Sequence, residues 1–478
     1  MDDRDLCFTP ATELGRLIRA GELSPVELAR AVLARIERLN PRLNAFLTVT
    51  AERALREARA AEARARRGAL LGPLDGIPYS IKDLESTAGV RTTFGSRWFE
   101  NHVPTVDGAV AGRLRASGAV LLGKTNTSSF GHKDSCDNLL GAPCVNPWNT
   151  ERTSGASSGG AGAAAAAGLG PLAHGSDGAG SIRIPSALCG VFGLKPSFGR
   201  VAQHPSADYW AARSHSGPMT RTVRDAALML QVLAGPDPRD PLSIDREPDD
   251  YLAACDGDLA GLRVAWSPDF GYAAVDPQVR ALTEAAARRL EDAGCRVEER
   301  ATPWSDPIDF HRVIYEVGVG ARQDDRARER PEWIEPSMMR MIETARATSA
   351  VDHSKALMAR SAFYDAVRAF FDDVDLLLTP QMPVTAWPAD PALQVERDQG
   401  PTEIGGRPTP TMHHRLAFTF PFNLTGQPAA SVPCGFTAER LPVGLQIVGR
   451  WHDDTTVLRA AACFEALQPW AEHRPPED

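Results

Sequence analysis

The sequence lacks several features that mark whole classes of protein. It has no apolar run of about 18 residues, so no membrane-spanning helix is expected. Its first residues, MDDRDLCFTP, are acidic and contain no apolar stretch typical of a signal peptide. Basic residues number 52 against 61 acidic ones, a net charge of -9, whereas sequence-independent nucleic-acid binders usually have a basic excess. The composition therefore predicts neither a membrane nor a nucleic-acid partner.

Cysteine is sparse as well, and it follows no metal-binding or disulfide pattern. The eight cysteines are scattered and contain no CxxC pair, which favours reduced thiols and a cytoplasmic protein. The histidines show no metal-ligand spacing, such as HxxxH with a third ligand. We therefore expect neither a metal nor a cofactor.

The first 67 residues are predicted to be helical and to pack on the rest of the chain. The segment Ser24-Pro25-Val26-Glu27 matches a capping box with proline at the first helical position. Apolar residues at helical spacing continue to Leu39, and Asn40-Pro41 is expected to end this helix. Residues 51–67 are rich in Ala, Glu and Arg, which is typical of a solvent-facing helix.

From about residue 74, short apolar runs alternate with helical stretches, which is typical of an α/β fold with a largely parallel sheet. No repeat or linker divides the chain, so we expect one domain over residues 1–478. Residues 385–412 are rich in proline and polar residues and indicate a long loop. The expected strands are 119–122, 169–173, 261–266, 295–297, 375–378, 429–433 and 443–448.

The segment TSGASSGGAGAAAAAGLGPLAHGSDGAGS, residues 153–181, is the most informative part of the chain. A flexible Gly/Ser linker is the plain interpretation, but a linker needs neither the alanine run nor the apolar stretch after it. We predict a loop, a helix, a short strand and a second loop. Glycine in both loops allows backbone N–H groups to converge on an anion, and both loops present serines.

Two serine loops need a base to activate them, and Lys82 is a candidate. It lies in GIPYSIKD, inside an apolar, strand-like stretch. A lysine there is either a surface charge or a buried amine, and from the residues alone the surface is favoured. A buried lysine loses its proton readily, because desolvation disfavours its charge. The neutral amine could then accept a proton from a serine.

Several motifs together resemble the amidase signature family, over roughly residues 8–236 and 370–468. GIPYSIKD resembles the family's lysine motif, and GASSGG resembles its first serine motif, usually GGSSGG. GSDGAGSIRIP resembles the nucleophile motif, usually GSDTGGSIR, while GVFGLKPSFGRV and LPVGLQIVGR also follow in order. The resemblance implies a single large α/β domain with a twisted mixed sheet flanked by helices on both faces.

The resemblance also implies roles for individual residues. The catalytic lysine falls on Lys82, the bridging serine, held by a cis peptide bond, on Ser157, and the nucleophile on Ser181. Supporting positions fall on Ser158 and Asp177. The amides of the oxyanion hole fall on Gly178, Ala179, Gly180 and Ser181. Ala156 replaces a glycine, and Gly178-Ala179 replaces Thr-Gly; backbone amides tolerate alanine where φ stays negative.

Two other motifs point to different enzymes. Residues 118–125, GAVLLGKT, match a P-loop, but the apolar interior favours a buried strand over a phosphate-binding loop. Residues 155–159, GASSG, match the nucleophile elbow of an α/β-hydrolase esterase, which would use Ser157 with a later acid and histidine. No apolar strand precedes this elbow, since residues 149–154 are polar.

The expected substrate is a small, neutral, fairly apolar amide, with ester and carbamate (urethane) hydrolysis by the same acyl transfer. The alternative function is that of the glutamine-hydrolysing subunit of a tRNA-dependent amidotransferase. The sequence leaves open whether the protein forms a homodimer.

Pocket residues are predicted at Phe130, Cys136, Tyr209 and Trp210. The loops hold few ions; the exceptions are Lys133, Asp134, Asp137, Asp208 and Arg213, and in the middle of the chain Arg312, Arg322, Asp324 and Asp325.

Overall fold

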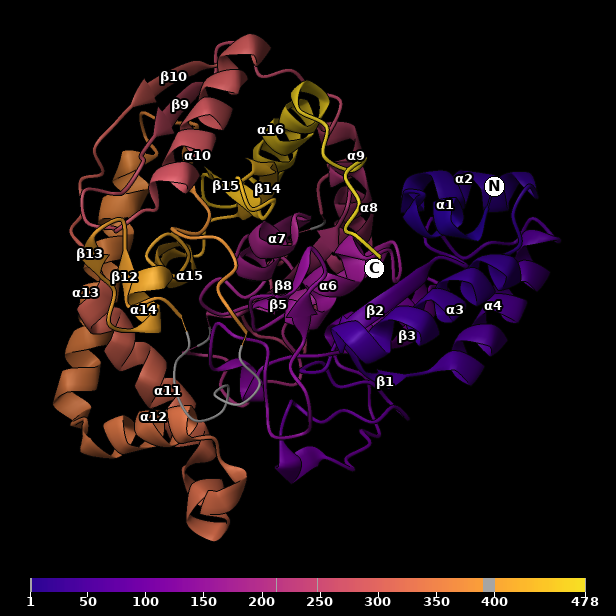
Figure 1. The fold of residues 1–478 in the computed structure, drawn as a ribbon, viewed down its shortest axis with the longest axis horizontal. Coiled ribbons are helices and arrows are strands. Elements are labelled where there is room, and N and C mark those ends of the chain that lie inside the picture. Colours follow the sequence, from indigo (N-terminus) through magenta and orange to yellow (C-terminus); the bar gives the residue numbers. More distant parts are fainter. Residues whose placement is uncertain (1, 212, 247, 390–399, 478) are drawn as a thin grey trace.

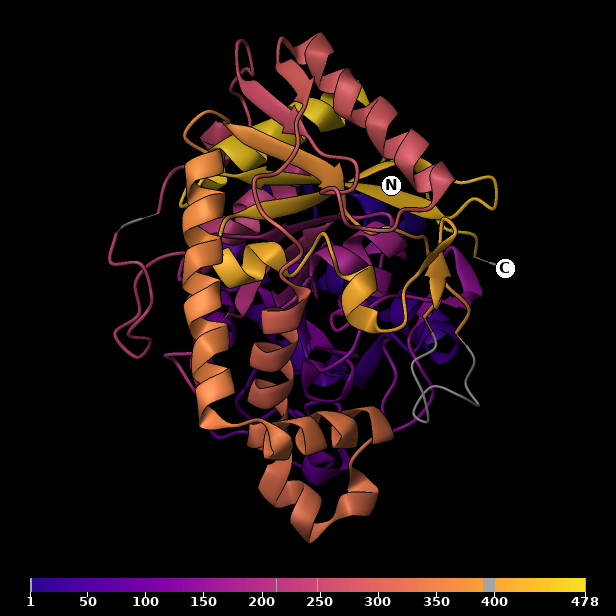
Figure 2. The same cartoon turned by 90° about the vertical axis from the view of Figure 1, so that its left-hand side faces the viewer.

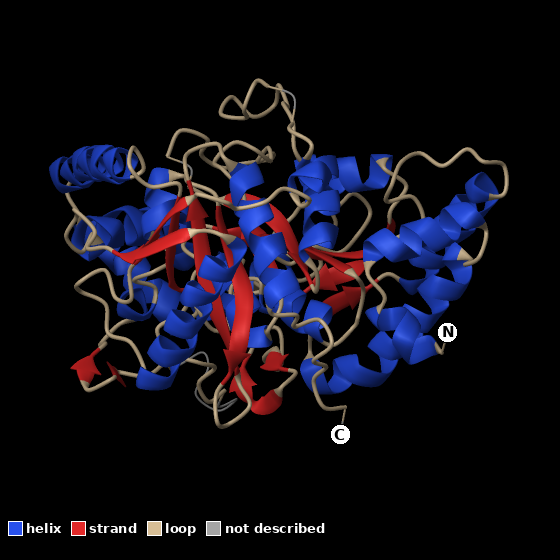
Figure 3. Cartoon of the chain, turned by 90° about the horizontal axis from the view of Figure 1, so that it is seen from above, coloured by secondary structure: helices blue, strands red, loops and turns tan. Residues whose placement is uncertain are grey.

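A computed structural model describes residues 2–211, 213–246, 248–389 and 400–477. A mixed sheet of 11 strands runs through this part of the chain in the order β1-β3-β2-β6-β8-β7-β14-β15-β11-β9-β10. Figure 3 shows the strands in the interior with helices on both sides. The structure is a single large α/β domain, as the resemblance implies.

The central sheet is parallel only in part. β2 pairs in parallel with β3 and β6, and β9 pairs in parallel with β10 and β11. The remaining neighbours are antiparallel. The strands of the sheet are β1 (Phe46–Val49), β2 (Pro78–Lys82), β3 (Val120–Thr125), β6 (Leu172–Asp177), β7 (Phe192–Lys195), β8 (His215–Thr220), β9 (Arg263–Trp266), β10 (Arg296–Glu299), β11 (Leu376–Pro380), β14 (Ala429–Phe436) and β15 (Pro442–Gly449).

Two small hairpins lie outside this sheet. They are β4 (Val145–Asn146) with β5 (Asn149–Thr153), and β12 (Glu403–Ile404) with β13 (Arg407–Pro408). The second hairpin lies within the predicted loop 385–412, and a helix begins at the last residue of this range, Met412. Residues 390–399 of the range fall outside the described residues.

Figure 1 shows helices α1–α4 together near the amino terminus and helices α11–α13 together on the opposite side of the molecule. Figure 2 shows α13 as one long helix along that side. The α-helices are α1 (Asp3–Phe8), α2 (Ala11–Ala20), α3 (Pro25–Leu43), α4 (Ala51–Ala65), α5 (Ala109–Ala116), α6 (Gly159–Ala166), α7 (Arg183–Cys189), α8 (Val223–Leu233), α9 (Tyr251–Ala254), α10 (Pro277–Arg289), α11 (Ile308–Glu329), α12 (Pro336–Ala347), α13 (Ala350–Phe370), α14 (Met412–Arg415), α15 (Pro421–Thr425) and α16 (Asp454–Leu467). Short 3₁₀ turns are η1 (Arg97–Phe99), η2 (Ser129–Gly131), η3 (Leu290–Ala293) and η4 (Pro331–Trp333).

The amino-terminal helices share the apolar core of the sheet. Leu14, Leu28 and Ile36 are buried together with strand residues such as Leu121 and Leu172. Ser24 caps α3 as predicted, because its hydroxyl accepts hydrogen bonds from the Val26 and Glu27 N–H groups. Residues 1–67 therefore contribute one wall of the main core in the part that is described.

Two predicted boundaries are wrong. Helix α3 passes through Pro41 and ends at Leu43, where Asn44 adopts a left-handed conformation and donates its N–H to the Asn40 carbonyl. A proline in the last turn removes only one helical hydrogen bond, which the helix tolerates. The strand expected at 169–173 starts at Leu172 instead, because Gly170, with φ +132°, and Pro171 form the approach to it.

Three neighbouring strands of the sheet end on the same side, where candidate site residues lie. Strands β3, β2 and β6 are parallel neighbours, so their carboxyl ends meet at the same side of the sheet. Lys82 is the last residue of β2, and Asp177 is the last residue of β6. Ligand sites of open α/β sheets commonly lie at such carboxyl ends.

Candidate active site

Lys82 is buried, although the residues alone favoured a surface position. Strand β2 is apolar and lies between two other strands, so the side chain is 0% exposed. Its Nζ lies 2.7 Å from Ser157 Oγ, 3.0 Å from Ser176 Oγ and 3.2 Å from the Ser176 carbonyl oxygen. Burial lowers the pKa of Lys82 to about 7, against the opposing effect of the Asp177 carboxylate.

Ser157 lies in the glycine-rich turn that leads into α6. The peptide bond between Ala156 and Ser157 is cis. Its neighbour Ser158 fixes the loop to β6: Ser158 Oγ donates to the Ser176 carbonyl at 3.1 Å and accepts from the Ser176 N–H at 3.2 Å. Ser158 also donates its N–H to the Ser181 carbonyl at 3.1 Å, so the two serine loops are joined.

The loop between β6 and α7 carries Ser181. Asp177 is the centre of this loop, because its carboxylate accepts from the Gly180 N–H at 2.6 Å and from the Ile182 N–H at 3.2 Å. Although burial opposes ionisation, the Arg183 guanidinium at 2.9 Å holds the pKa of Asp177 well below its ordinary value. Asn423 donates to the same carboxylate at 2.9 Å. The loop is thus built around a buried carboxylate.

Three of the four amides expected in the oxyanion hole have no hydrogen-bond acceptor among the described residues. They belong to Gly178, Ala179 and Ser181, which line a cavity. The fourth, Gly180, differs from the expectation: its N–H is already donated to Asp177, and its backbone has φ +121°. Ala179 is absent from the residues with positive φ, so alanine fits there without strain.

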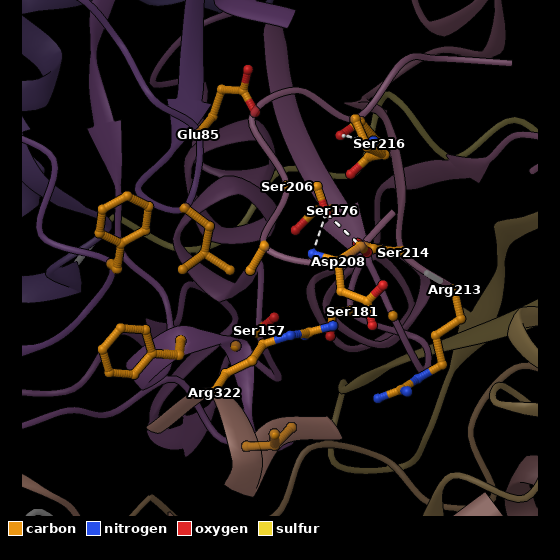
Figure 4. A pocket seen from close by; sticks show the side chains of 18 of the residues that line it. Glu85, Ser157, Ser176, Ser181, Ser206, Asp208, Arg213, Ser214, Ser216 and Arg322 are labelled. Carbon is orange, nitrogen blue, oxygen red and sulfur yellow. Dashed lines mark hydrogen bonds between the residues drawn. The ribbon is translucent and has the colours of Figure 1, made fainter. Parts of the chain in front are cut away.

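The Ser181 side chain faces this cavity, which has a volume of about 530 Å³. Figure 4 shows Ser157 and Ser181 together at its wall. Among the described residues, no hydrogen bond joins the two hydroxyl groups. Catalytic hydrogen bonds are often open in a free enzyme and close only with substrate bound. The apolar residues that line the cavity include Leu84, Phe94, Phe99, Phe130 and Val319, of which the Phe99 ring contacts the rings of Phe94 and Phe130.

Of the predicted pocket residues, Phe130 lines the cavity, and the other three do not line it in the described structure. Cys136 is buried beneath the start of α6, so close that a Cβ on Gly159 would lie 2.5 Å from its own Cβ. Tyr209 turns back on its own loop, with its hydroxyl 2.8 Å from His204 Nδ1. Trp210 points to solvent and is 77% exposed.

Several site residues have no counterpart among those predicted. Ser176 contacts the lysine amine, and Thr419 donates its hydroxyl to the Ala179 carbonyl at 2.5 Å. Asn423 reaches the loop from α15. Thr419 and Asn423 lie more than 200 residues away in sequence from the loop they hold. Only Ser176 could have been suspected, because it directly precedes Asp177 in the serine-rich segment.

The two competing motifs adopt other structures. Residues 120–125 form β3 inside the sheet, and Lys124 donates to the Thr87 hydroxyl at 2.9 Å and to the Glu85 carbonyl. The segment therefore forms no phosphate-binding loop. The GASSG segment follows β5, a polar strand of a separate hairpin, whereas a nucleophile elbow follows a strand of the main sheet.

The described residues contain neither a metal-binding cluster nor a membrane-spanning helix. No group of three His, Cys, Asp or Glu side chains among them is placed to hold a metal ion. No helix in the described ranges combines the length and apolar character needed to cross a membrane. The eight cysteines are present as free thiols.

The family model described as "Amidase" matches residues 27–458. The chain belongs to the amidase signature family. An acylamidase of Rhodococcus erythropolis is 40% identical over 99% of this chain and 98% of its own. A glutamyl-tRNA(Gln) amidotransferase subunit from Roseiflexus sp. (strain RS-1) is 38% identical over 95% of each chain. The crystal structure of a bacterial aryl acylamidase of the amidase signature family superposes with a TM-score of 0.91 and 30% identity over 97% of each chain.

Membership of this family makes the protein an amide-hydrolysing enzyme. At the carboxyl ends of β2 and β6 lie the cavity that Ser181 faces, the buried Lys82 and the two serine loops. The buried carboxylate of Asp177 gives that site a fixed framework.

Proposed function

We propose that Lys82, Ser157 and Ser181 act as base, bridge and nucleophile of an amide hydrolase. The observation that carries this proposal is the buried, weakly basic Lys82 amine 2.7 Å from Ser157 Oγ, beside a cavity that Ser181 faces. A lysine whose pKa is about 7 is largely neutral at slightly alkaline pH and has a lone pair for a proton.

In the proposed reaction, neutral Lys82 takes the proton of Ser157 as Ser157 takes that of Ser181. The Ser181 oxygen attacks the amide carbon, and the negative charge develops on the carbonyl oxygen. The protons return along the same path to the leaving amine. Water then hydrolyses the acyl-enzyme by the same steps, which splits one difficult reaction into two easier ones.

In this proposal the amides of Gly178, Ala179 and Ser181, three residues that line the cavity, stabilise the developing oxyanion. Preorganised donors of this kind are usually the largest single contribution to such catalysis, about 3–4 kcal/mol for one donor. Gly180 has a different role in this proposal, because its N–H holds Asp177 and thereby shapes the loop.

The proposed substrates are small linear amides with an aryl or alkyl body, together with the corresponding esters and carbamates. The aromatic wall of Phe94, Phe99 and Phe130 supports an apolar body. The names of two relatives, an acylamidase and an aryl acylamidase, point the same way. Esters and carbamates fit because the oxyanion hole contacts the carbonyl oxygen and not the leaving atom.

The test is the hydrolysis of a neutral anilide by the wild type and by Ser181→Ala, with fluorophosphonate labelling in parallel. We expect turnover and labelling in the wild type and loss of both in the variant. A wild-type adduct on Ser157, or full labelling of Ser181→Ala, would overturn the assignment of the nucleophile.

A second candidate is glutamine hydrolysis as part of an amidotransferase. It is favoured by the 38% identity to the Roseiflexus amidotransferase protein over 95% of both chains. The same assay decides between the two: a kcat/KM for glutamine well above that for an apolar anilide would favour the second. Copurification of further subunits would support it independently.

A further inference from the structure

Arg213 is a buried guanidinium group that faces the active-site cavity. The residue is 9% exposed and lines the cavity. Among the described residues no acidic side chain comes within 4.0 Å of it. The one hydrogen bond of its guanidinium within the described chain is a long contact of 3.5 Å from Nη1 to the Ile314 carbonyl, and the Nε–H has no acceptor there.

The guanidinium is nevertheless held in place. It lies over the Tyr315 ring, 4.8 Å from the ring centre, and the Tyr315 hydroxyl donates to the His132 carbonyl at 3.0 Å. Stacking on an aromatic face leaves the edge of the guanidinium, which carries the N–H donors, available to a ligand. A fixed, dehydrated donor of this kind is what a specific binding site requires.

The charges around Arg213 are positive. Burial lowers its pKa to about 10, and the nearby cations Arg322 and Arg360 act in the same direction. Arg322, on α11, also lines the cavity and forms no ion pair in the described structure. Figure 4 shows Arg213 and Arg322 entering the cavity from different elements of the chain. Arg326, the third arginine that lines this cavity, is stacked on the Phe99 and Phe130 rings. Arg213 and Arg322 therefore share one region with no counter-charge from the part of the chain that is described.

The two carboxylates that line the same cavity are engaged elsewhere. Asp208 accepts the N–H groups of Trp210 and Ala211 at 3.0 and 3.1 Å. Glu85 accepts the N–H groups of Val110 and Ala111 at 3.2 and 3.4 Å, at the start of α5. Neither lies within 4.0 Å of Arg213 or Arg322. The cations are thus left for a group that comes with the substrate.

We propose that Arg213, assisted by Arg322, binds a carboxylate at the end of the substrate remote from the scissile amide. This inference rests on the proposed function and narrows it: the aromatic wall holds the apolar body, and the arginines hold an anionic end. It revises the expectation of a neutral substrate, which followed from the small number of ions in the flanking loops.

Physical chemistry favours such pairing. A buried charge without a partner is costly, and a carboxylate that binds a guanidinium forms two parallel charge-assisted hydrogen bonds. Hydrogen bonds to charged groups contribute about 1.5–3 kcal/mol, which corresponds to roughly a tenfold to hundredfold preference. Because this contact is remote from the reacting bond, it is expected to act mainly on KM.

The test uses 4-nitroanilides of a homologous series of dicarboxylic acids, each compared with the ω-hydroxy acyl anilide of equal length. Release of nitroaniline gives kcat and KM for the wild type, Arg213→Met and Arg213→Lys. Arg312→Met is the control for loss of an arginine elsewhere, because Arg312 pairs with Glu316 at 3.3 Å and does not line this cavity. Binding of the same probes to Ser181→Ala, with and without Arg213→Met, is measured by calorimetry.

We expect the wild type to prefer the acid of the best chain length at least about tenfold in kcat/KM, mainly through KM. Arg213→Met should lose this preference, so that its kcat/KM falls far more on the acid than on the hydroxy probe, Arg213→Lys should retain part of it, and Arg312→Met should match the wild type. The inference would be overturned by equal kcat/KM values for the acid and hydroxy probes, or by a preference for the acid that is unchanged in Arg213→Met. In either case, turnover that depends on Ser181 would leave the hydrolase assignment intact. Absence of Ser181-dependent turnover of every probe would overturn both.

Discussion

Two lysines, Lys82 and Lys124, lie on neighbouring parallel strands and are both completely buried. Burial lowers the pKa of each. Around Lys124 the carboxylates of Asp83 and Glu85 oppose this effect, and Asp83 Oδ1 is 4.0 Å from the amine. Around Lys82 the contacts are hydroxyl groups and a carbonyl. The neighbouring groups of a buried lysine therefore determine whether its amine serves as a cation or as a base.

Lys124 has the surroundings of a structural cation. Its amine contacts the Thr87 hydroxyl and the Glu85 carbonyl, both of which accept hydrogen bonds from an ammonium group. Lys82 has the surroundings of a base, because Ser157 can supply a proton and no carboxylate of the described chain lies within 4.0 Å. Four predictions test this difference, in order of decreasing effect on turnover.

The largest loss of turnover is expected in Lys82→Met. The variant removes the proposed base, so kcat/KM should fall by about 10³–10⁴, at the upper end of general acid–base contributions. Steady-state kinetics on a neutral anilide measures the loss. Lys82→Arg is the control for charge: it keeps a cation but cannot accept a proton, so it should be as inactive as Lys82→Met. Activity in Lys82→Arg near that of the wild type would assign the effect to charge and not to basicity.

Ser157→Ala should lose less activity than Lys82→Met. The substitution removes the bridging hydroxyl but leaves the amine, and a water molecule can occupy the space and relay the proton. We expect a loss of about 10²–10³ in kcat, with Ser181 still labelled slowly by a fluorophosphonate. Ser158→Ala is the matched control, because its hydroxyl contacts Ser176 and not the lysine. An equal loss in both variants would contradict a specific bridging role.

Lys124→Met should act on stability and not on chemistry. Removing this cation leaves Asp83 and Glu85 buried without a counter-charge, and breaking a buried ionic contact costs about 3–5 kcal/mol. Chemical denaturation should report a lower free energy of unfolding, whereas kcat of the folded fraction should stay within about threefold of the wild type. A stable Lys124→Met that is as inactive as Lys82→Met would remove the distinction between the two lysines.

The smallest change in turnover is expected near neutral pH, from the dependence of kcat/KM on pH in the wild-type enzyme. Protonated Lys82 has no lone pair, so kcat/KM should rise with pH and level off above the pKa of about 7. A neutral anilide is the suitable substrate, because it does not titrate itself. An inflection near the ordinary lysine value, about 10.4, would mean that burial does not lower the pKa of the essential base.

Much of this site follows from its local sequence. GIPYSIKD, GASSGG and GSDGAGSIRIP each contain one member of the lysine-serine-serine arrangement, because strand ends and glycine-rich loops are encoded over a few adjacent residues. The same is true of the alternating strands and helices of the fold. The roles of Lys82, Ser157 and Ser181 were predicted from the resemblance of these motifs to those of the family, whereas the residues alone favoured a surface position for Lys82.

Contacts across long stretches of sequence could not be predicted in this way. Thr419 and Asn423 hold the loop that carries Ser181 only because α15 and the turn before it fold back over this loop. Tyr209 and Trp210 were predicted as pocket residues, yet the Tyr209 hydroxyl contacts His204 and the Trp210 side chain is exposed to solvent. Which way a loop side chain turns depends on packing that no local pattern records.

The most direct test of the central claim is the titration of the Lys82 amine itself. Lysine occurs only at positions 82, 124, 133, 195 and 355, so carbon-13 labelling of lysine Cε gives a simple NMR spectrum. The signal absent from Lys82→Met identifies the residue. We predict that this signal titrates with a pKa of about 7. A signal that stays in the protonated position above about pH 9, near the ordinary lysine range, would contradict the assignment of Lys82 as the neutral base.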